Sequence, residues 1–165
     1  MGLHAIDEAK RGLNCNKPAC MEGCPISTPV PAMIRMFLDG QMTDAAEMVF
    51  ENNPLSVICS LVCDHEKQCE GHCVKGIKGE PVHISSIENY ISDTCFDKMI
   101  LDKKPWNGHR IGVVGAGPAG ITIAIRMACR GYKVTIFEVR EKIGGILRYG
   151  IPEFRLPKSI LDRYY

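Results

Sequence analysis

Apolar residues recur at helical spacing through most of the first hundred residues. The stretch 32–38 is almost entirely apolar. It follows Pro29 and Pro31, and Gly40 marks its end. Proline just before a helix and glycine just after it are common at helix ends. This pattern predicts a helix over 32–38.

A second helix is expected over 44–51, with Thr43 as its N-terminal cap. The Asn-Asn-Pro sequence that follows interrupts the pattern, and Pro54 fits the first turn of a third helix that runs to Val62. After an irregular loop over 64–81, a long amphipathic helix is predicted from an apolar stripe at Ile84, Ile87, Ile91, Cys95 and Met99. These elements predict a small α-helical domain over residues 1–102.

The pattern changes after a polar segment at 103–109, which we interpret as a linker. Strands are predicted at 110–114 and 133–138, with a helix at 118–130 between them. This order is typical of a Rossmann-like βαβ unit. Residues 110–165 are therefore expected to be the N-terminal, incomplete part of a nucleotide-binding domain.

Composition and charge exclude some functions. The chain has 165 residues, 20 Lys and Arg against 19 Asp and Glu, and 45% hydrophobic residues. This balance gives no excess of positive charge, so it does not indicate binding to nucleic acid or to a membrane surface. The N-terminal residues lack an apolar core of signal-peptide length, and no apolar run is long enough to span a membrane. We expect a cytoplasmic, globular protein.

Seven of the nine cysteines lie in two groups: Cys15, Cys20 and Cys24, then Cys59, Cys63, Cys69 and Cys73. In a reducing compartment such groups indicate metal binding more than disulfides. Zinc and unpaired buried thiols are the alternatives, but zinc favours C-x2-C pairs, whereas the gaps here are irregular. Iron-sulfur clusters are the favoured interpretation. Cys95 and Cys129 fall on apolar helix faces and are expected in the core.

A glycine signature, GAGPAG, follows the first predicted strand. Gly115, Gly117 and Gly120 occupy the strand-to-helix turn, and Glu138 ends the second strand. Glycines allow a pyrophosphate to approach the helix N-terminus, and the acidic residue accepts hydrogen bonds from ribose. A tight turn without a ligand is the alternative. The full arrangement favours a dinucleotide site.

Four motifs in order resemble one family: GLNCNKPACMEGCP, CSLVCDHEKQCEGHC, GAGPAG and EVREKIGGILRYGIPEFRLPK. They resemble the small (beta) subunit of glutamate synthase and the N-terminal part of dihydropyrimidine dehydrogenase. The resemblance implies a helical domain with two 4Fe-4S clusters, then an FAD domain into which an NADPH domain is inserted. It also implies that the glycine signature binds FAD, which the residues alone do not distinguish from NADPH.

The resemblance assigns metal ligands position by position. Cys15, Cys20 and Cys73 fall on one cluster, and Cys24, Cys63 and Cys69 on the other, with Glu88 as its fourth ligand. Glu88 is otherwise a solvated residue of an amphipathic helix. Cys59 matches a cysteine that does not bind the cluster in the dehydrogenase.

One position departs from the family pattern. The first cysteine of an expected C-x-x-C pair falls on Gly12, which has no side chain to bind a metal. The cluster of Cys15, Cys20 and Cys73 therefore lacks a ligand unless Cys59, water or a partner supplies one. A three-iron cluster, or no cluster there, is an alternative.

On the flavin side, the resemblance implies a pyrophosphate site at Gly115, Ala116, Gly117, Pro118, Ala119 and Gly120. It implies that Glu138 binds the adenosine ribose and that Gly145, Ile146 and Arg155 lie nearer the rest of FAD. Arg148 and Arg155 are alternatively solvated charges. None of these residues is expected to be an acid or base catalyst, because the family's cofactors carry the hydride and electron transfer.

Two functions follow from this. The favoured one is an electron-transfer subunit, or part of one, from a glutamate-synthase-type NAD(P)H oxidoreductase. The alternative is a docking module that binds a larger oxidoreductase subunit. The expected partner is such a subunit or an NAD(P)H domain that these residues do not encode. Without it, the 165-residue polypeptide is expected to be inactive with NAD(P)H.

Overall fold

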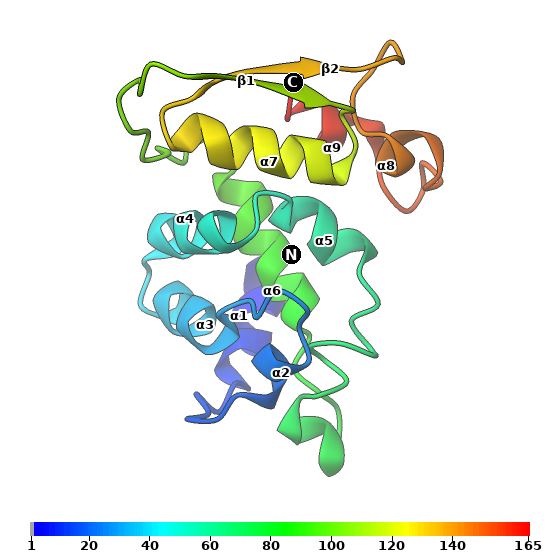
Figure 1. Ribbon diagram of the computed structural model, residues 1–165. Coiled ribbons are helices and arrows are strands. Elements are labelled where there is room, and N and C mark those ends of the chain that lie inside the picture. Colours follow the sequence, from blue (N-terminus) through cyan, green and yellow to red (C-terminus); the bar gives the residue numbers. More distant parts are fainter. Residues whose placement is uncertain (1) are drawn as a thin grey trace. The chain divides into compact units, whose positions relative to one another are not determined.

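The computed structural model describes residues 2–165, with side chains from residue 4 onward. It separates into two compact units, Met1–Met99 and Ile100–Tyr165. The first contains helices only, and the second contains the strands (Figure 1).

The first unit is built around its last long helix. Its elements are α1 (Gly2–Lys10), α2 (Ala19–Glu22), α3 (Val30–Leu38), α4 (Met42–Asn52), α5 (Ser56–Val62), the 3-10 helix η1 (Val74–Ile77) and α6 (Ile84–Cys95). Helix α6 packs against α1, α3, α4 and α5. The core that it shares with α3 and α4 includes the buried residues Met33, Val49, Ile87 and Ile91. The apolar stripe predicted for α6 therefore faces the core.

The turn after α3 explains one error in the predicted boundaries. Gly40 has φ +78°, its N–H donates to Phe37 at 3.2 Å, and the next N–H donates to Met36 at 2.8 Å. This Schellman turn ends α3 at the expected glycine. It also lets α4 begin immediately, at Met42. Thr43 therefore lies inside the first turn, and its predicted capping role is wrong.

The other predicted helices are present with shifted ends. Helix α5 begins two residues after Pro54, and α6 stops at Cys95, four residues before the end of the stripe. The short helices α1, α2 and η1 were not predicted. Among residues 2–165, no helix combines the length and the apolar character needed to cross a membrane.

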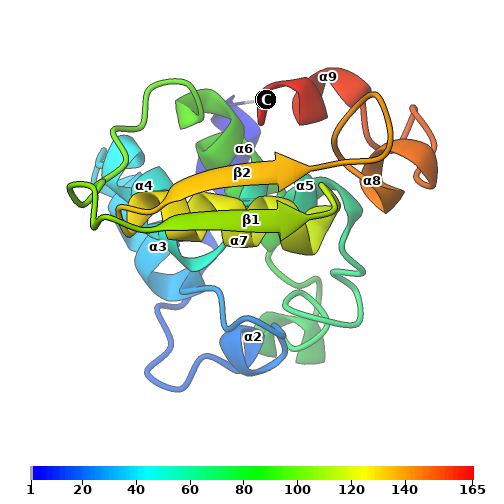
Figure 2. The ribbon, with the colours of Figure 1, turned by 45° about the horizontal axis from the view of Figure 1, so that its top comes forward.

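The second unit contains the predicted βαβ order. Strands β1 (Arg110–Val114) and β2 (Lys133–Phe137) are parallel, with Arg110 opposite Lys133 and Val114 opposite Phe137. Helix α7 (Pro118–Cys129) connects them and covers one face of this small sheet (Figure 2). On these strands Val114 is 91% exposed and Phe137 is 60% exposed.

Two short helices complete the second unit, α8 (Ile146–Tyr149) and α9 (Lys158–Asp162). The latter starts directly after Pro157. Leu147, Leu156 and Leu161 are buried. These side chains hold the segment after β2 in place, and that segment reaches the glycine signature.

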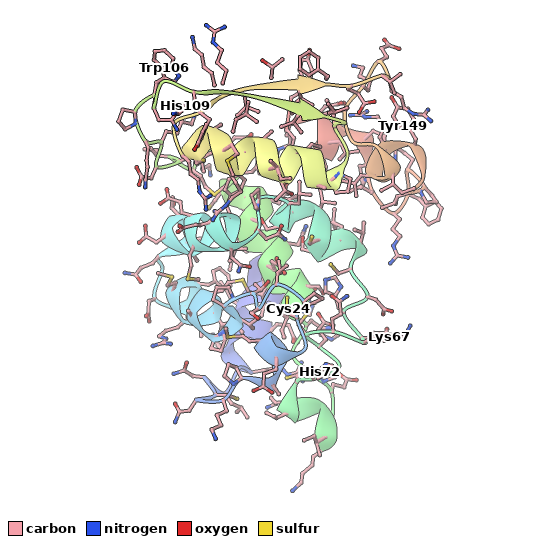
Figure 3. All side chains as sticks on the ribbon, viewed as in Figure 1. Cys24, Lys67, His72, Trp106, His109 and Tyr149 are labelled. Carbon is pink, nitrogen blue, oxygen red and sulfur yellow. The ribbon has the colours of Figure 1, made fainter. Side chains whose placement is uncertain are left out.

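The segment interpreted as a linker belongs to the second unit. The Lys104 N–H donates to Cys129 at 2.9 Å, and the Asn107 N–H donates to Gly131 at 3.0 Å. The ammonium group of Lys133 lies 5.6 Å from the ring centre of Trp106, which is labelled in Figure 3. These contacts attach the segment to the C-terminal end of α7 and the start of β2.

Candidate iron-sulfur sites and nucleotide cradle

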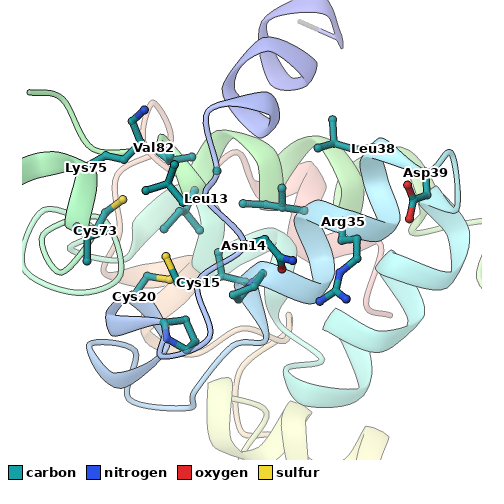
Figure 4. A pocket seen from close by; sticks show the side chains of 17 residues that line it. Leu13, Asn14, Cys15, Cys20, Arg35, Leu38, Asp39, Cys73, Lys75 and Val82 are labelled. Atoms are coloured by element: carbon teal, nitrogen blue, oxygen red, sulfur yellow. The ribbon is translucent and has the colours of Figure 1, made fainter.

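Three of the predicted ligands, Cys15, Cys20 and Cys73, line one pocket of about 190 Å³. They come from the loop after α1, from α2 and from the residue before η1. Figure 4 shows the three cysteines gathered at one end of this pocket, with Arg35 and Asp39 at the other. Burial, followed by the charges of Cys73 and Cys15, raises the pKa of Cys20. The three thiols therefore form one electrostatically coupled group.

Gly12 lines the same pocket as these cysteines. A Cβ atom built on Gly12 lies 3.1 Å from the Ala9 carbonyl oxygen and 3.4 Å from two carbon atoms of Ile34. The backbone there does not have a positive φ. The position that the resemblance assigns to a fourth cysteine thus lines the same pocket as the other three, and a side chain there requires the Ala9 carbonyl to shift by a few tenths of an ångström.

The second group of thiols lies near α5, α6 and the cysteine-rich loop between them, residues 63–83. Cys63 directly follows α5, and its N–H donates to the Cys59 carbonyl at 3.0 Å. The neighbouring Cys59 thiol and burial raise the pKa of Cys63, with smaller contributions from Glu88 and Cys69. Burial raises the pKa of Cys69 to about 12, with further contributions that include Glu88 and Cys24. The structure therefore brings these predicted ligands together around Glu88.

Cys24 reaches this group from the loop that follows α2. Its sulfur lies 3.3 Å from the hydroxyl oxygen of Thr28, which is buried. The Lys67 side chain, by contrast, points outward from the cysteine-rich loop (Figure 3). The Cys24 sulfur thus contacts a buried residue, while Lys67 of the cysteine-rich loop faces solvent.

Glu88 is not a solvated surface residue. It is only 6% exposed, and burial together with the neighbouring charge of Cys59 raises its pKa to about 8. A buried carboxylate is costly unless it is paired or binds a metal. The structure gives the solvated alternative no support.

The arrangement of possible metal-binding side chains bears on which metal group these sites could hold. Among residues 2–165, no three His, Cys, Asp or Glu side chains converge on a point suitable for a single metal ion. Tetrahedral zinc with bonds of about 2.3 Å requires sulfur atoms within about 4 Å of one another. A 4Fe-4S cluster holds its ligands on four separate irons and accepts a wider spread. The described residues thus show no ready-made site for a single ion, and an iron-sulfur cluster does not require its ligands to converge on one point.

Two buried carboxylates that the sequence analysis missed fix the start of α6. Glu70 accepts hydrogen bonds from the Ser85 N–H at 2.8 Å and from its hydroxyl at 2.7 Å. Glu8, from α1, accepts from the His83 N–H at 3.0 Å. Negative charge near a helix N-terminus is stabilising. These contacts tie α1 and the cysteine-rich loop to the helix that carries Glu88.

Replacing Glu8 with glutamine is expected to destabilise the first unit by about 1 kcal/mol at neutral pH, because a charge-assisted bond becomes neutral. Burial opposes ionisation of Glu8, but the His83 N–H and Arg11 outweigh it and hold the pKa below its ordinary value of 4.5. A lowered folded-state pKa stabilises the fold above pH 4.5, and this stabilisation is lost as pH falls through the folded-state value.

Urea unfolding at several pH values measures this effect. The parent should lose stability over this acid range more steeply than Glu8→Gln. Lys67→Gln is the matched control, because it breaks an exposed ion pair with Asp64 and should change stability by less than about 0.5 kcal/mol. Equal acid sensitivity of the parent and Glu8→Gln would contradict the prediction.

In the second unit, each glycine of the signature has a distinct role. Gly115 has φ +94°, and a Cβ on Gly120 would lie 1.9 Å from the Gly115 carbonyl oxygen, so both are required for the turn itself. A Cβ on Gly117 would meet nothing within 4 Å. This open side of Gly117, at the N-terminus of α7, is where a pyrophosphate approaches in a dinucleotide fold.

The remaining predicted nucleotide residues lie around this turn. Glu138 accepts from the Ala116 N–H at 2.7 Å and from the Arg140 N–H at 2.9 Å, and these bonds lower its pKa. The Gly144 N–H donates to Ala116 at 2.7 Å. A Cβ on Gly145 would lie 2.9 Å from the Gly117 Cα. The Gly-Gly pair thus packs directly on the glycine turn.

The other predicted contacts are more exposed or have another role. Ile146 is 64% exposed, and Arg155 is also exposed. Arg148 is not a solvated charge: it donates to the Ile143 carbonyl at 2.6 Å and to Asp162 at 2.5 Å. Arg148 therefore connects α8 to α9.

Comparison with known proteins identifies the helical unit. Residues 2–100 match the family model described as dihydropyrimidine dehydrogenase domain II, 4Fe-4S cluster. The chain belongs to this family. Residues 113–158 match the model of an NAD(P)-binding Rossmann-like domain. The predicted fold class, a helical iron-sulfur domain followed by a Rossmann-like segment, is confirmed.

Curated relatives are similar to this chain over nearly its whole length. The chain is 35% identical over 162 residues to the glutamate synthase [NADPH] small chain of Halomonas elongata, covering 96% of this chain and 34% of the relative. It is 36% identical over 164 residues to the NAD-dependent dihydropyrimidine dehydrogenase subunit PreT of Escherichia coli K12, covering 97% and 39%. These matches confirm the resemblance found in the sequence and give no support to the docking-module alternative.

Proposed function

We propose that this chain is the iron-sulfur and flavin-binding part of an NAD(P)H-dependent oxidoreductase of the glutamate synthase small-chain type. The observation that carries the proposal is the convergence of six scattered cysteines into two groups within the helical unit. The chain spans about a third of the Halomonas glutamate synthase relative and 39% of the Escherichia coli PreT relative. The substrate, acceptor and partner of a whole protein are therefore part of the proposal.

One cluster is proposed at Cys24, Cys63, Cys69 and Glu88. The support is that Glu88 and the thiols influence one another electrostatically and that Glu88 is buried. Bound clusters supply single-electron transfer. The four side chains must give up their protons to bind iron, so assembly is expected to be favoured at higher pH and to stabilise the fold.

A second cluster, with three protein thiolates, is proposed at Cys15, Cys20 and Cys73. The shared pocket supports this assignment. Because Gly12 contributes no ligand, this site is proposed to be less stable than the other. The two clusters would pass single electrons between them. The cluster at Cys15, Cys20 and Cys73 would be lost more readily than the other.

The nucleotide is proposed to be FAD, as the family resemblance implies. Its pyrophosphate is placed on the turn formed by Gly115, Ala116, Gly117, Pro118, Ala119 and Gly120. Glu138 is proposed to bind the adenosine ribose, and Gly145, Ile146 and Arg155 to approach the rest of the flavin. The open side of Gly117 and its packing against Gly145 support this location. The chain's own residues position the nucleotide rather than transfer protons.

Gly117→Ala and Gly120→Ala are expected to act differently. The Cβ at Gly120 collides with backbone, so Gly120→Ala should destabilise the second unit by about 1–3 kcal/mol. Gly117→Ala should leave stability unchanged but block the pyrophosphate, raising the FAD dissociation constant by about tenfold or more, equivalent to about 1.4 kcal/mol. Thermal unfolding and flavin fluorescence titration measure the two effects, and a normal FAD affinity in Gly117→Ala would refute the location.

Metal analysis of anaerobically reconstituted protein tests the function. Iron and acid-labile sulfide should be present in equal amounts, with visible absorbance that bleaches on reduction with dithionite. Zinc, or iron without sulfide, would refute the proposal.

The 165-residue polypeptide alone is expected to have no NAD(P)H turnover with an artificial electron acceptor. Hydride transfer requires nicotinamide against flavin, and the glycine turn with Glu138 is proposed to hold only the adenine half of FAD. Supplying an NAD(P)H domain or partner subunit should tighten flavin binding and give turnover together. Turnover by the purified polypeptide, free of other flavoenzymes, would contradict the proposal that an NAD(P)H domain or partner subunit is required.

A further inference from the structure

His72, which is labelled in Figure 3, lies in the cysteine-rich loop and is not one of the proposed ligands. Its backbone N–H donates to the Gln68 carbonyl oxygen at 3.1 Å, and its ring Nδ1 lies 2.7 Å from the same oxygen. A carbonyl oxygen only accepts, so Nδ1 is the donor. Gln68 directly precedes the proposed ligand Cys69. The imidazole ring is therefore fixed against the turn that leads into Cys69.

The same ring packs on Gly23, which belongs to the first cysteine segment and directly precedes Cys24. A Cβ atom built on Gly23 would lie 2.4 Å from Nδ1 of His72, 2.5 Å from its Cγ and 2.9 Å from the Gln68 carbonyl oxygen. Gly23 has φ −75°, a backbone conformation that any residue adopts. Its lack of a side chain is thus required by the approach of the cysteine-rich loop and not by the turn itself.

This contact joins the two segments that supply Cys24 and Cys69 to one proposed cluster. Burial raises the pKa of Cys69, and Cys24 is among the further contributors, so the two thiols lie near one another. The His72 side chain is exposed and is not part of the buried core of the helical unit. Core packing therefore does not account for the position of this ring.

We infer that His72 is a positioning residue that holds the turn before Cys24 against the turn before Cys69, so that both thiols face one iron-sulfur cluster. The inference rests on the proposed function. The ring acts through its contact with Gly23 and its hydrogen bond to Gln68. Groups that orient metal ligands typically contribute about 10- to 100-fold to metal retention.

The experiment measures how fast an iron chelator removes iron from the anaerobically reconstituted 165-residue protein. The slower phase of release, from the more stable cluster, should become about tenfold faster in His72→Ala. Gly23→Ala should have a similar effect, because its Cβ displaces the ring. The double variant should be no faster than Gly23→Ala, because both changes break one contact. Lys67→Gln, in the same loop, is the matched control and should release iron at the parent rate.

Two further readouts separate positioning from a general loss of structure. Far-UV circular dichroism of reconstituted His72→Ala should match that of the parent, because the exposed ring lies outside the buried core. The EPR spectrum of the reduced cluster should broaden in His72→Ala, because the ligands are held less uniformly. His72→Asn should restore the parent spectrum and most of the slow release, because its amide also donates to the Gln68 carbonyl.

Parent-like iron release in His72→Ala would overturn the inference and leave the proposed function intact. Additive effects of Gly23→Ala and His72→Ala would also overturn it, because the two residues would then not act through one contact. A parent that assembles no cluster would instead refute the proposed function, and the inference with it.

Discussion

Cys63→Ser is expected to remove the cluster proposed at Cys24, Cys63, Cys69 and Glu88 and to lower the stability of the helical unit with it. Serine keeps the size of the side chain but replaces a soft thiolate with a weaker iron ligand. Iron content should fall by about four per chain. Because the cluster would join α5, α6 and the cysteine-rich loop, its binding energy is also folding energy.

Iron and sulfide analysis with thermal unfolding, in parallel with the parent, measures both effects. Cys129→Ser is the matched control, because it changes a half-buried cysteine of the other unit and should leave iron unaltered. If Cys63→Ser retained all its iron, the ligand assignment would be wrong. Iron loss with unchanged stability would instead separate cluster binding from the fold.

The helices with a strong apolar stripe were predictable from the sequence, because burial in the core imposes the helical period. Helix α6 is the clearest case, with Ile84, Ile87 and Ile91 all buried. Helix α1 was missed because the buried side chains on its inner face include the small residues Ala5 and Ala9, which give a weak apolar signal. Helices α2 and α8, at four residues each, are too short for a period to be recognised.

The surroundings of the candidate sites were less predictable, because they depend on contacts distant in sequence. Glu88 occupies a position that is polar in the α6 pattern, and only the packing of α5 shows that it is buried. Glu8 reaches a helix start 75 residues away. No local motif marks such a pair.

The glycine signature was predictable because its chemistry is local. A strand, three glycines and a helix in register require a tight turn, and the structure gives Gly115 and Gly120 steric reasons to be glycine. The residues of this turn do not decide between FAD and NADPH. Gly117 leaves room for either pyrophosphate, so the identity of the nucleotide rests on the family resemblance.

Gly12→Cys is expected to stabilise the cluster proposed at Cys15, Cys20 and Cys73. Gly12 lies in the same pocket as these three thiols, so a fourth thiolate would complete a four-cysteine ligand set. The new Cβ requires Ile34, whose nearest carbons lie at 3.4 Å, and the Ala9 carbonyl at 3.1 Å to give slightly. This strain is small compared with the gain from an added iron ligand.

The expected result is an increase toward about eight irons per chain, with slower loss of iron and of the EPR signal in air. Gly12→Ala is the matched control: it introduces the same Cβ contacts without a thiol, so it should match or fall below the parent. If both variants gained iron equally, the effect would come from the backbone and not from ligation. A parent that already holds two air-stable 4Fe-4S clusters would mean that another ligand completes the site, because three thiolates leave one iron without a protein donor.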